Sequence, residues 1–300
     1  MNECFAKVNG IELCYEALGD STGRPLLLIM GLGGPLIWWD DGLCDLLVDR
    51  GFYVIRYDNR DCGRSTMMNG AVTPSPLRAL LGDNRTASYR LDDMAADAAG
   101  LLDHLEVPRA HVMGISMGGM IAQTLAIRDP ERVLSLTSIM STTGSRRVGW
   151  PRPRVLPVLW RRPPRSREGY VEHALRVWRL IGSPGFPFDE RRIRERAGAT
   201  YDRGIDPRGT ARQLVAITAS GDRTAKLVKV SAPTLVIHGA DDPLVHPSGG
   251  IATAKAIPGA ELMTIRGMGH DLPPELWPRV VNAVDRNAKR AEADVRVTVG

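Results

Sequence analysis

A serine surrounded by glycines stands near the middle of the chain, at residues 114–119, which read GISMGG. The apolar run at residues 111–114 predicts a strand, and residues 117–126 predict a helix. A strand that turns directly into a helix forces the residue at the turn into a strained conformation, so its neighbours must be very small. The turn holds the serine hydroxyl above the sheet, beside helix amides that stabilise developing negative charge. The pattern therefore indicates a nucleophilic serine, Ser116.

A serine hydroxyl needs a base near neutral pH, and the base needs a carboxylate to orient it. Among six histidines, His270 alone follows the last predicted strand in a glycine-flanked loop, residues 267–271. Two adjacent carboxylates, Asp241 and Asp242, follow the preceding predicted strand. Neighbouring residues of an extended segment point in opposite directions, so one of the two faces His270. These residues predict a triad of serine, histidine and one of the two aspartates.

The carbonyl oxygen of an attacked ester needs two backbone donors when it becomes negatively charged. The amide of Met117, directly after the serine, is the first. The second is expected from the glycine-rich residues 30–34 (MGLGG), where another apolar run ends, with the amide of Leu32 as the candidate. Taken alone, this segment would also fit a plain turn, so its assignment depends on Ser116.

Short β-rich runs alternate with helical patterns along most of the chain. Strands are predicted at residues 25–30, 52–57, 111–114, 133–139, 234–238 and 261–265. This order predicts an α/β fold, with a mostly parallel, doubly wound sheet that helices cover on both faces. The carboxyl ends of parallel strands meet at one edge of a sheet, so the loops that carry the serine, the aspartates and the histidine are expected to lie together there.

The alternation stops between the fourth and fifth of these strands. Residues 145–225 predict an inserted helical cap, with amphipathic stretches at 170–181 and 190–197, and residues 1–144 and 226–300 form the core. Aromatic residues of the cap and of the glycine-rich loop predict a pocket for a hydrophobic acyl or alcohol group. The candidate pocket residues are Trp38, Trp39, Trp150, Trp178 and Phe186. The alternative is that these side chains only pack the cap against the core.

The positive charge of the chain is concentrated in this insertion. The chain has 300 residues and a net charge of +5, with 34 Arg against five Lys, and residues 146–212 hold seventeen of the Arg against seven acidic residues. Such a block could steer anionic substrates, approach lipid headgroups or form a solvated face paired with acids such as Glu172, Glu190 and Glu195. No recognition motif for nucleic acid accompanies it, so nucleic acid is not an expected partner.

The other features of the sequence predict a cytoplasmic protein without a cofactor. The four cysteines have no CxxC pair and no metal-ligand spacing, so neither a disulfide scaffold nor a metal site is expected. The first residues lack the pattern of a signal peptide. No apolar run reaches the length of about 18 residues that membrane insertion requires. A small-molecule ester is the expected partner, and the oligomeric state is left open.

Together these motifs resemble the α/β-hydrolase superfamily over nearly the whole chain. Within it, the Met-Gly pair at residues 30–31 and the turn at residues 56–65 (RYDNRDCGRS) are similar to actinobacterial esterases of the aclacinomycin methylesterase group. The G-x-x-D spacing of the family at residues 239–242 implies that Asp242 is the acid. Many relatives have His-Gly where this chain has Met30, which leaves the outer hydrogen bonding of that loop open.

The resemblance implies a carboxylesterase that forms an acyl-enzyme on Ser116 from a small to medium hydrophobic ester, with methyl esters among the candidates. A serine at this turn argues against haloalkane dehalogenases and epoxide hydrolases, which carry aspartate there, and against dienelactone hydrolases, which carry cysteine. Thioester cleavage, lactone opening and perhydrolysis use the same triad and stay open. A noncatalytic ligand-binding role on the same fold is the further alternative.

Overall fold

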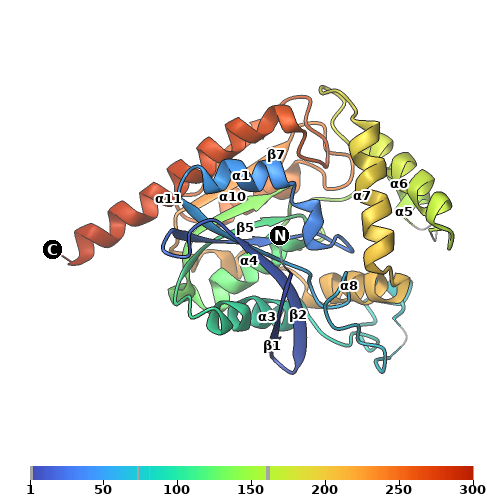
Figure 1. Cartoon of the computed structure of the whole chain (residues 1–300), viewed down its shortest axis with the longest axis horizontal. Helices are drawn as coiled ribbons and strands as arrows, with labels where there is room; N and C mark the ends of the chain where they lie inside the picture. The colour runs from blue at the N-terminus through green and yellow to red at the C-terminus, as the bar shows by residue number, and fades with distance from the viewer. Residues whose placement is uncertain (1–2, 73, 81, 160–162, 300) are drawn as a thin grey trace.

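The computed structural model describes residues 3–72, 74–80, 82–159 and 163–299. Its centre is a sheet with the strand order β1-β2-β4-β3-β5-β6-β7-β8 (Figure 1). The strands are β1 (Cys4–Val8), β2 (Ile11–Leu18), β3 (Arg24–Ile29), β4 (Phe52–Tyr57), β5 (Ala110–Ile115), β6 (Val133–Ile139), β7 (Thr234–Gly239) and β8 (Glu261–Ile265). From β4 to β8 all neighbours in the sheet are parallel, whereas β2 is antiparallel to both β1 and β4. The predicted α/β fold with a mostly parallel sheet is confirmed.

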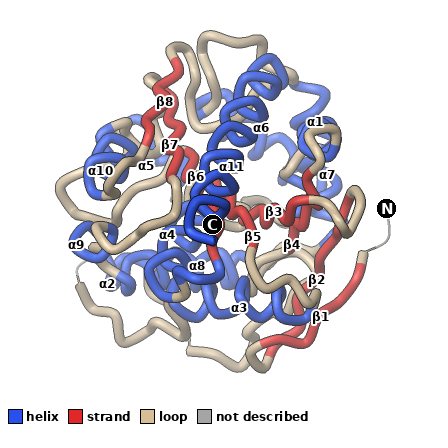
Figure 2. Tube along the Cα trace, turned by 90° about the vertical axis from the view of Figure 1, so that its left-hand side faces the viewer, coloured by secondary structure: helices blue, strands red, loops and turns tan. Residues whose placement is uncertain are grey.

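The sheet separates two layers of helices, and Figure 2 shows the strands crossing the molecule between them. The α-helices are α1 (Asp41–Val48), α2 (Pro76–Leu80), α3 (Leu91–His104), α4 (Met117–Arg128), α5 (Leu156–Leu159), α6 (Arg167–Ile181), α7 (Glu190–Arg203), α8 (Pro207–Ser220), α9 (Thr224–Leu227), α10 (Ser248–Ala256) and α11 (Trp277–Val299). The short 3-10 segments are η1 (Leu36–Trp38), η2 (Pro130–Arg132), η3 (Pro153–Val155) and η4 (Pro274–Leu276). None of the helices in the described ranges has the length and hydropathy that a membrane crossing requires.

Both faces of the sheet are buried, as the continuous apolar runs of its inner strands require. Along β3, Leu27 and Ile29 belong to a hydrophobic cluster with α3 and α4. Leu26 and Leu28 point the other way and belong to a second cluster with α1 and α11. The turn at Ser116, between β5 and α4, therefore stands on a sheet that is packed on both sides.

All six strands predicted from the sequence are present as β3 to β8, with ends within one residue of the prediction. The hairpin of β1 and β2 was not predicted. The last residues of β1 alternate between buried and exposed, but β2 has a run of consecutive buried residues that breaks the alternation. Its turn is Asn9–Gly10, with φ of 48° and 76°. Asn-Gly between two strands is a hairpin signal that the sequence does contain.

The insertion between β6 and β7 is helical, as predicted. The amphipathic stretches at 170–181 and 190–197 lie in α6 and α7, which pack on each other through Val171, Leu175 and Ile193. Figure 1 shows α5, α6 and α7 gathered at one end of the molecule, while α11 ends at the opposite side. A cap over residues 145–225 stays our proposal for the domain division, and its end at residue 225 falls inside the short helix α9.

A buried ion pair between Arg60 and Asp97 joins the turn after β4 to helix α3. Arg60 Nε and Nη2 donate to the two carboxylate oxygens of Asp97 at 2.6 Å each. We predict that Asp97→Ala lowers the free energy of unfolding by about 3–5 kcal/mol, because it leaves the guanidinium buried without its partner. Asp103→Ala, on the same helix, removes an exposed pair with Arg132 and should cost less than about 1 kcal/mol. Urea unfolding measures both, and equal losses would contradict the prediction.

Candidate active site

Ser116 occupies the turn between β5 and α4 with φ 56° and ψ −117°, a conformation that side chains normally avoid. Its amide donates to the carbonyl oxygen of Ile139 at 2.8 Å. Its own carbonyl accepts a hydrogen bond of 2.8 Å from Ser141 Oγ. These bonds to the neighbouring strand β6 and the residues after it hold the strained backbone in place.

The glycines of the motif are required by space. A Cβ at Gly114 would overlap the carbonyl oxygen of Gly118. A Cβ at Gly118 would overlap the carbonyl oxygen of Ile29, at the end of β3. Helix α4 therefore approaches β5 and β3 more closely than any larger residue allows.

His270 and Asp242 form a hydrogen-bonded pair in which Nδ1 and Oδ2 lie 2.7 Å apart. Asp242 is completely buried, and its other oxygen accepts hydrogen bonds from the amides of Leu244 (2.8 Å) and Val245 (2.9 Å). An ionised Asp242 makes Nδ1 the protonated nitrogen, so Nε2 is left as the basic one. Asp241 points elsewhere and accepts from the amide of Gly267 at 2.8 Å. The geometry thus brings Asp242, and not Asp241, to His270.

The end of helix α6, in the insertion between β6 and β7, holds the loop that carries His270. The amide of His270 donates to the carbonyl oxygen of Ile181 at 2.7 Å. The amide of Gly269 donates to Ser183 Oγ at 2.9 Å. Ser183 Oγ in turn donates to Asp271, whose pKa is raised by its burial. The position of the histidine therefore depends on the cap as well as on the sheet.

The glycine-rich loop after β3 passes beside the serine. A Cβ at Gly31 would stand 3.3 Å from Ser116 Cβ and 3.9 Å from Ser116 Oγ. The next residue, Leu32, follows in the same loop, which places the two predicted oxyanion donors, Leu32 and Met117, on segments that flank Ser116. The carbonyl oxygen of Met30 accepts a hydrogen bond of 3.0 Å from Asn59 Nδ2, which supplies the outer bonding that the sequence left open.

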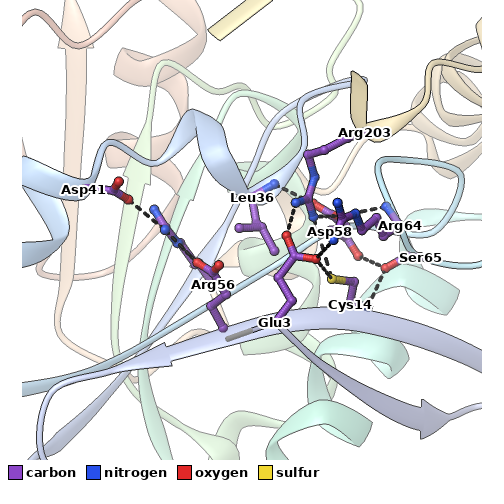
Figure 3. Close-up of polar contacts among 10 residues, drawn as sticks. Glu3, Cys14, Leu36, Asp41, Arg56, Asp58, Arg64, Ser65 and Arg203 are labelled. Carbon is purple, nitrogen blue, oxygen red and sulfur yellow. Dashed lines mark hydrogen bonds and ion pairs between the residues drawn. The ribbon is translucent and has the colours of Figure 1, made fainter. Parts of the chain in front are cut away.

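Two further side chains accept hydrogen bonds from backbone amides of the glycine-rich loop or of the residues that follow it. Gln213 of helix α8 accepts from the amide of Gly33 at 2.8 Å. Asp58 of the turn after β4 accepts from the amide of Leu36 at 2.6 Å, and Figure 3 shows Arg203 of helix α7 on the other oxygen of the same carboxylate. These roles are not predicted from the sequence. The aspartate-rich turn at residues 58–61 was a visible signal, whereas nothing near Gln213 pointed to the loop.

A cavity of about 380 Å³ opens at the serine, and Ser116, His270 and Leu32 line it. Three of the five predicted pocket residues line it as well, namely Trp38, Trp39 and Trp178. The rings of Trp38 and Trp178 are stacked at 4.9 Å, across the boundary between core and cap. In the described part of the chain, no three His, Cys, Asp or Glu side chains come together as metal ligands.

Trp150 and Phe186, the other two predicted pocket residues, do not line this cavity. Trp150 is 54% exposed, and its indole N–H donates to the carbonyl oxygen of Arg146. Phe186 packs against the core cluster near Gly267. An aromatic side chain indicates that a residue takes part in packing, but the residue type alone does not predict which residues of the insertion face the cavity.

The chain matches the family model of the alpha/beta hydrolase fold over residues 24–275, and it belongs to this family. It is 33% identical over 288 residues to rhodomycin D methylesterase of Streptomyces peucetius, covering 88% of this chain and 90% of the relative. It is 29% identical to 3-oxoadipate enol-lactonase 2 of Acinetobacter baylyi, over 80% and 79% of the two chains. The crystal structure of the enol-lactonase from Burkholderia xenovorans LB400 has a TM-score of 0.74 at 25% identity, and 95% and 100% of the two chains are covered. The chain is a hydrolase of the carboxylesterase type.

The strain at Ser116 gives a prediction about stability. Alanine keeps a Cβ, which this backbone conformation disfavours, whereas glycine adopts the conformation freely. We therefore expect Ser116→Gly to be more stable than Ser116→Ala by about 1–2 kcal/mol in urea unfolding. At Ser138, a buried serine in the regular strand β6, the same two substitutions should rank in the opposite order. If the free energy of unfolding of the alanine variant at position 116 equals or exceeds that of the glycine variant, the turn is not strained.

Proposed function

We propose that this chain is a serine carboxylic-ester hydrolase with Ser116 as nucleophile, His270 as general base and Asp242 as the acid that orients the histidine. The observation that carries the proposal is the 2.7 Å pair of His270 and Asp242, on the same cavity as the strained serine. Asp242 stays ionised through the reaction and stabilises the imidazolium that forms when His270 takes a proton.

The reaction runs in two halves. In the first, Ser116 Oγ attacks the ester carbonyl carbon while His270 Nε2 takes the hydroxyl proton. The tetrahedral intermediate then collapses, the acyl–oxygen bond of the substrate breaks, and the leaving alcohol receives the proton from His270. In the second half, a water gives a proton to His270 and attacks the acyl carbonyl carbon. The bond between that carbon and Ser116 Oγ then breaks, Oγ takes the proton back from His270, and the acid is released.

The amides of Leu32 and Met117 are the donors that we propose for the negatively charged oxygen of both intermediates. The close approach of Gly31 to Ser116 and the position of Met117 at the first turn of α4 support this assignment. Fixed backbone donors act without reorganisation during the reaction, and the loss of one such donor in other hydrolases costs about 10²–10³ in kcat.

We propose a small to medium hydrophobic ester as the substrate, and a methyl ester as the first choice. The cavity volume of about 380 Å³ and the stacked rings of Trp38 and Trp178 support an apolar, flat acyl group. The name of the relative from Streptomyces peucetius, a methylesterase, supports methanol as the leaving alcohol.

A lactone is the second candidate. It is favoured by the two enol-lactonases among the relatives, one of them a solved structure that covers nearly the whole chain. Opening a lactone needs the same nucleophile and base, and the only difference is that the leaving alcohol stays attached to the acyl group. Rates on a methyl ester and on a lactone of similar size distinguish the two candidates.

We also propose a cytoplasmic location and no nucleic-acid partner. The cysteines Cys14, Cys44 and Cys62 are buried without a disulfide, which is typical of a reducing compartment. Burial also raises the pKa of Cys14 and of Cys44 to about 12, so these thiols stay protonated and inert at neutral pH.

Adjacent aspartates allow a matched test of the mechanism. We expect Ser116→Ala to abolish turnover of p-nitrophenyl and methyl esters, and Asp242→Ala to lower kcat by about 10³–10⁴, because the histidine loses its orienting partner. Asp241→Ala removes an equally charged neighbour that does not touch His270 and should stay within about tenfold of wild type. Equal losses at positions 241 and 242 would contradict the assignment. Ligand binding by a wild-type protein without Ser116-dependent turnover would favour the noncatalytic role.

A further inference from the structure

Helix α8 of the inserted segment reaches into the core with a buried amide side chain. Gln213 is completely buried, and both ends of its amide are used. Its Oε1 accepts the hydrogen bond from the amide of Gly33, and its Nε2 donates to the carbonyl oxygen of Arg60 at 2.7 Å. One side chain thus links helix α8, the turn after β4 and the glycine-rich loop.

The link falls next to a proposed oxyanion donor. The amide of Gly33 belongs to the peptide group that directly follows Leu32, so holding this amide limits how that peptide plane rotates. Gly33 has a φ of 64°, and a glycine in that region has many other conformations open to it. Thr210, also on α8, lies so close that a Cβ at Gly33 would stand 3.0 Å from its Oγ1. Helix α8 therefore supplies both the hydrogen bond and the packing that restrict this part of the loop.

The other end of the loop is held in the same way from helix α7. Arg203, the last residue of that helix, lies 2.5 Å from Asp58 Oδ2, while Asp58 Oδ1 accepts from the amide of Leu36 (Figure 3). Asp58 is completely buried and Arg203 nearly so. The glycine-rich loop is thus fixed at Gly33 by Gln213 of the insertion. At Leu36 it is fixed by Asp58, which pairs with Arg203 of the insertion.

We propose that Gln213 is a positioning residue for the oxyanion loop, so that the insertion controls the rate of the chemical step as well as the shape of the pocket. The proposal rests on the proposed function, because a loop position matters for turnover only if Leu32 faces the reacting oxygen. Displacing a donor from the oxyanion removes stabilisation from the transition state more than from the bound ester. The effect therefore falls on kcat and much less on KM.

The test compares two buried glutamines. Gln213→Met keeps the length of the side chain and removes both the acceptor for Gly33 and the donor to Arg60. We expect kcat to fall about 10–100-fold with KM changed less than about threefold. Gln123→Met is the matched control: Gln123 is equally buried, on α4, and donates to Ser138 Oγ at 3.1 Å without touching the loop. Gln213→Glu keeps an acceptor for the amide of Gly33 but, when ionised, loses the donor to the carbonyl oxygen of Arg60, so its kcat should lie between those of Gln213→Met and the wild type.

The outcomes separate this inference from the proposed function. Equal kcat losses in the two methionine variants, or a full kcat in Gln213→Met, would overturn the positioning role while Ser116-dependent turnover of the wild type stays intact. A wild type without that turnover overturns both. Should the methionine variant not fold, Gln213→Asn keeps an amide at the site but withdraws it by one methylene, and its kcat decides in the same way.

A second, independent observation concerns the arginines of the insertion, which fall into two groups. Those on α6 and α7 are largely paired with acids, in pairs such as Arg167–Asp202, Arg179–Glu190 and Arg194–Glu172. Residues 146–165 contain no acid at all. Within the described ranges, four exposed arginines of that segment have no ion-pair partner: Arg147, Arg152, Arg154 and Arg165.

This basic segment also exposes large apolar side chains beside the cavity. Trp150 is 54% exposed and Leu156 38%. The amide of Arg152 donates to the carbonyl oxygen of Pro243 at 2.8 Å, and the following residue, Leu244, lines the cavity. Arginine with exposed tryptophan is the composition of surfaces that lie in the headgroup region of a bilayer, where the indole is half buried and the guanidinium meets phosphate.

We infer that this surface, formed by Arg147, Trp150, Arg152, Arg154 and Leu156, docks on an anionic lipid bilayer. The unpaired positive charge complements anionic headgroups, which are concentrated on the cytoplasmic leaflet. Hydrophobic esters partition into a bilayer, so docking here would bring the mouth of the cavity to a membrane-dissolved substrate. None of the helices in the described part of the chain is long and apolar enough to cross a bilayer, and the contact that we propose is peripheral.

Vesicle cosedimentation tests the inference without an activity assay. The wild type should bind vesicles of phosphatidylcholine mixed with phosphatidylglycerol, not phosphatidylcholine alone, and salt should release it. The triple variant Arg147→Gln, Arg152→Gln, Arg154→Gln should bind at least about tenfold more weakly. The control triple at Arg167, Arg179 and Arg191 removes the same charge from paired arginines and should bind like the wild type. Equal losses in the two triples, no binding to anionic vesicles, or tighter binding to a DNA duplex than to vesicles, would overturn it.

Discussion

The strained backbone of Ser116 is the constraint on which the rest of the site depends. A conformation of this kind costs about 1–3 kcal/mol and persists only where the surroundings determine it. Here they do so through the hydrogen bond that the amide of Ser116 donates to Ile139, the hydrogen bond that its carbonyl accepts from Ser141, and helix packing that only Gly114 and Gly118 permit. Because the backbone of Ser116 is fixed, the loop that carries His270 and the glycine-rich loop after β3 must be positioned relative to it by other contacts.

Both of those loops are held in part from the inserted helices. The amide of His270 is bonded to the end of α6 at Ile181, and Gly33 is bonded to Gln213 on α8. Trp38 of the core and Trp178 of the insertion form one stacked wall of the cavity. The insertion thus contributes to the geometry of the proposed chemistry and to the pocket. Exchanging it between relatives is expected to change turnover as well as substrate choice.

Residue patterns within short segments were enough to predict the strands and the turns that short-range interactions determine. Six strands and the turn at Ser116 follow from apolar runs and glycine spacing. The loops that carry His270 and the adjacent Asp241 and Asp242 follow from their place after two strands of a parallel sheet, whereas the choice of Asp242 came from the resemblance to the α/β-hydrolase superfamily. Tertiary contacts decide the rest. Trp150 is no different in type from Trp178, yet it faces solvent while Trp178 lines the cavity. Gln213 lies 180 residues from Gly33, and no pattern in the sequence connects them.

Covalent labelling of the serine tests the proposed mechanism most directly. A fluorophosphonate should react with the folded protein at one site, and peptide mass spectrometry should find the added mass on the peptide that contains Ser116. The label should be absent from Ser116→Ala and slowed in His270→Ala, because the histidine removes the proton from the attacking hydroxyl. Ester turnover by a protein whose Ser116 stays unlabelled, or label on another residue that abolishes the activity, would contradict the mechanism.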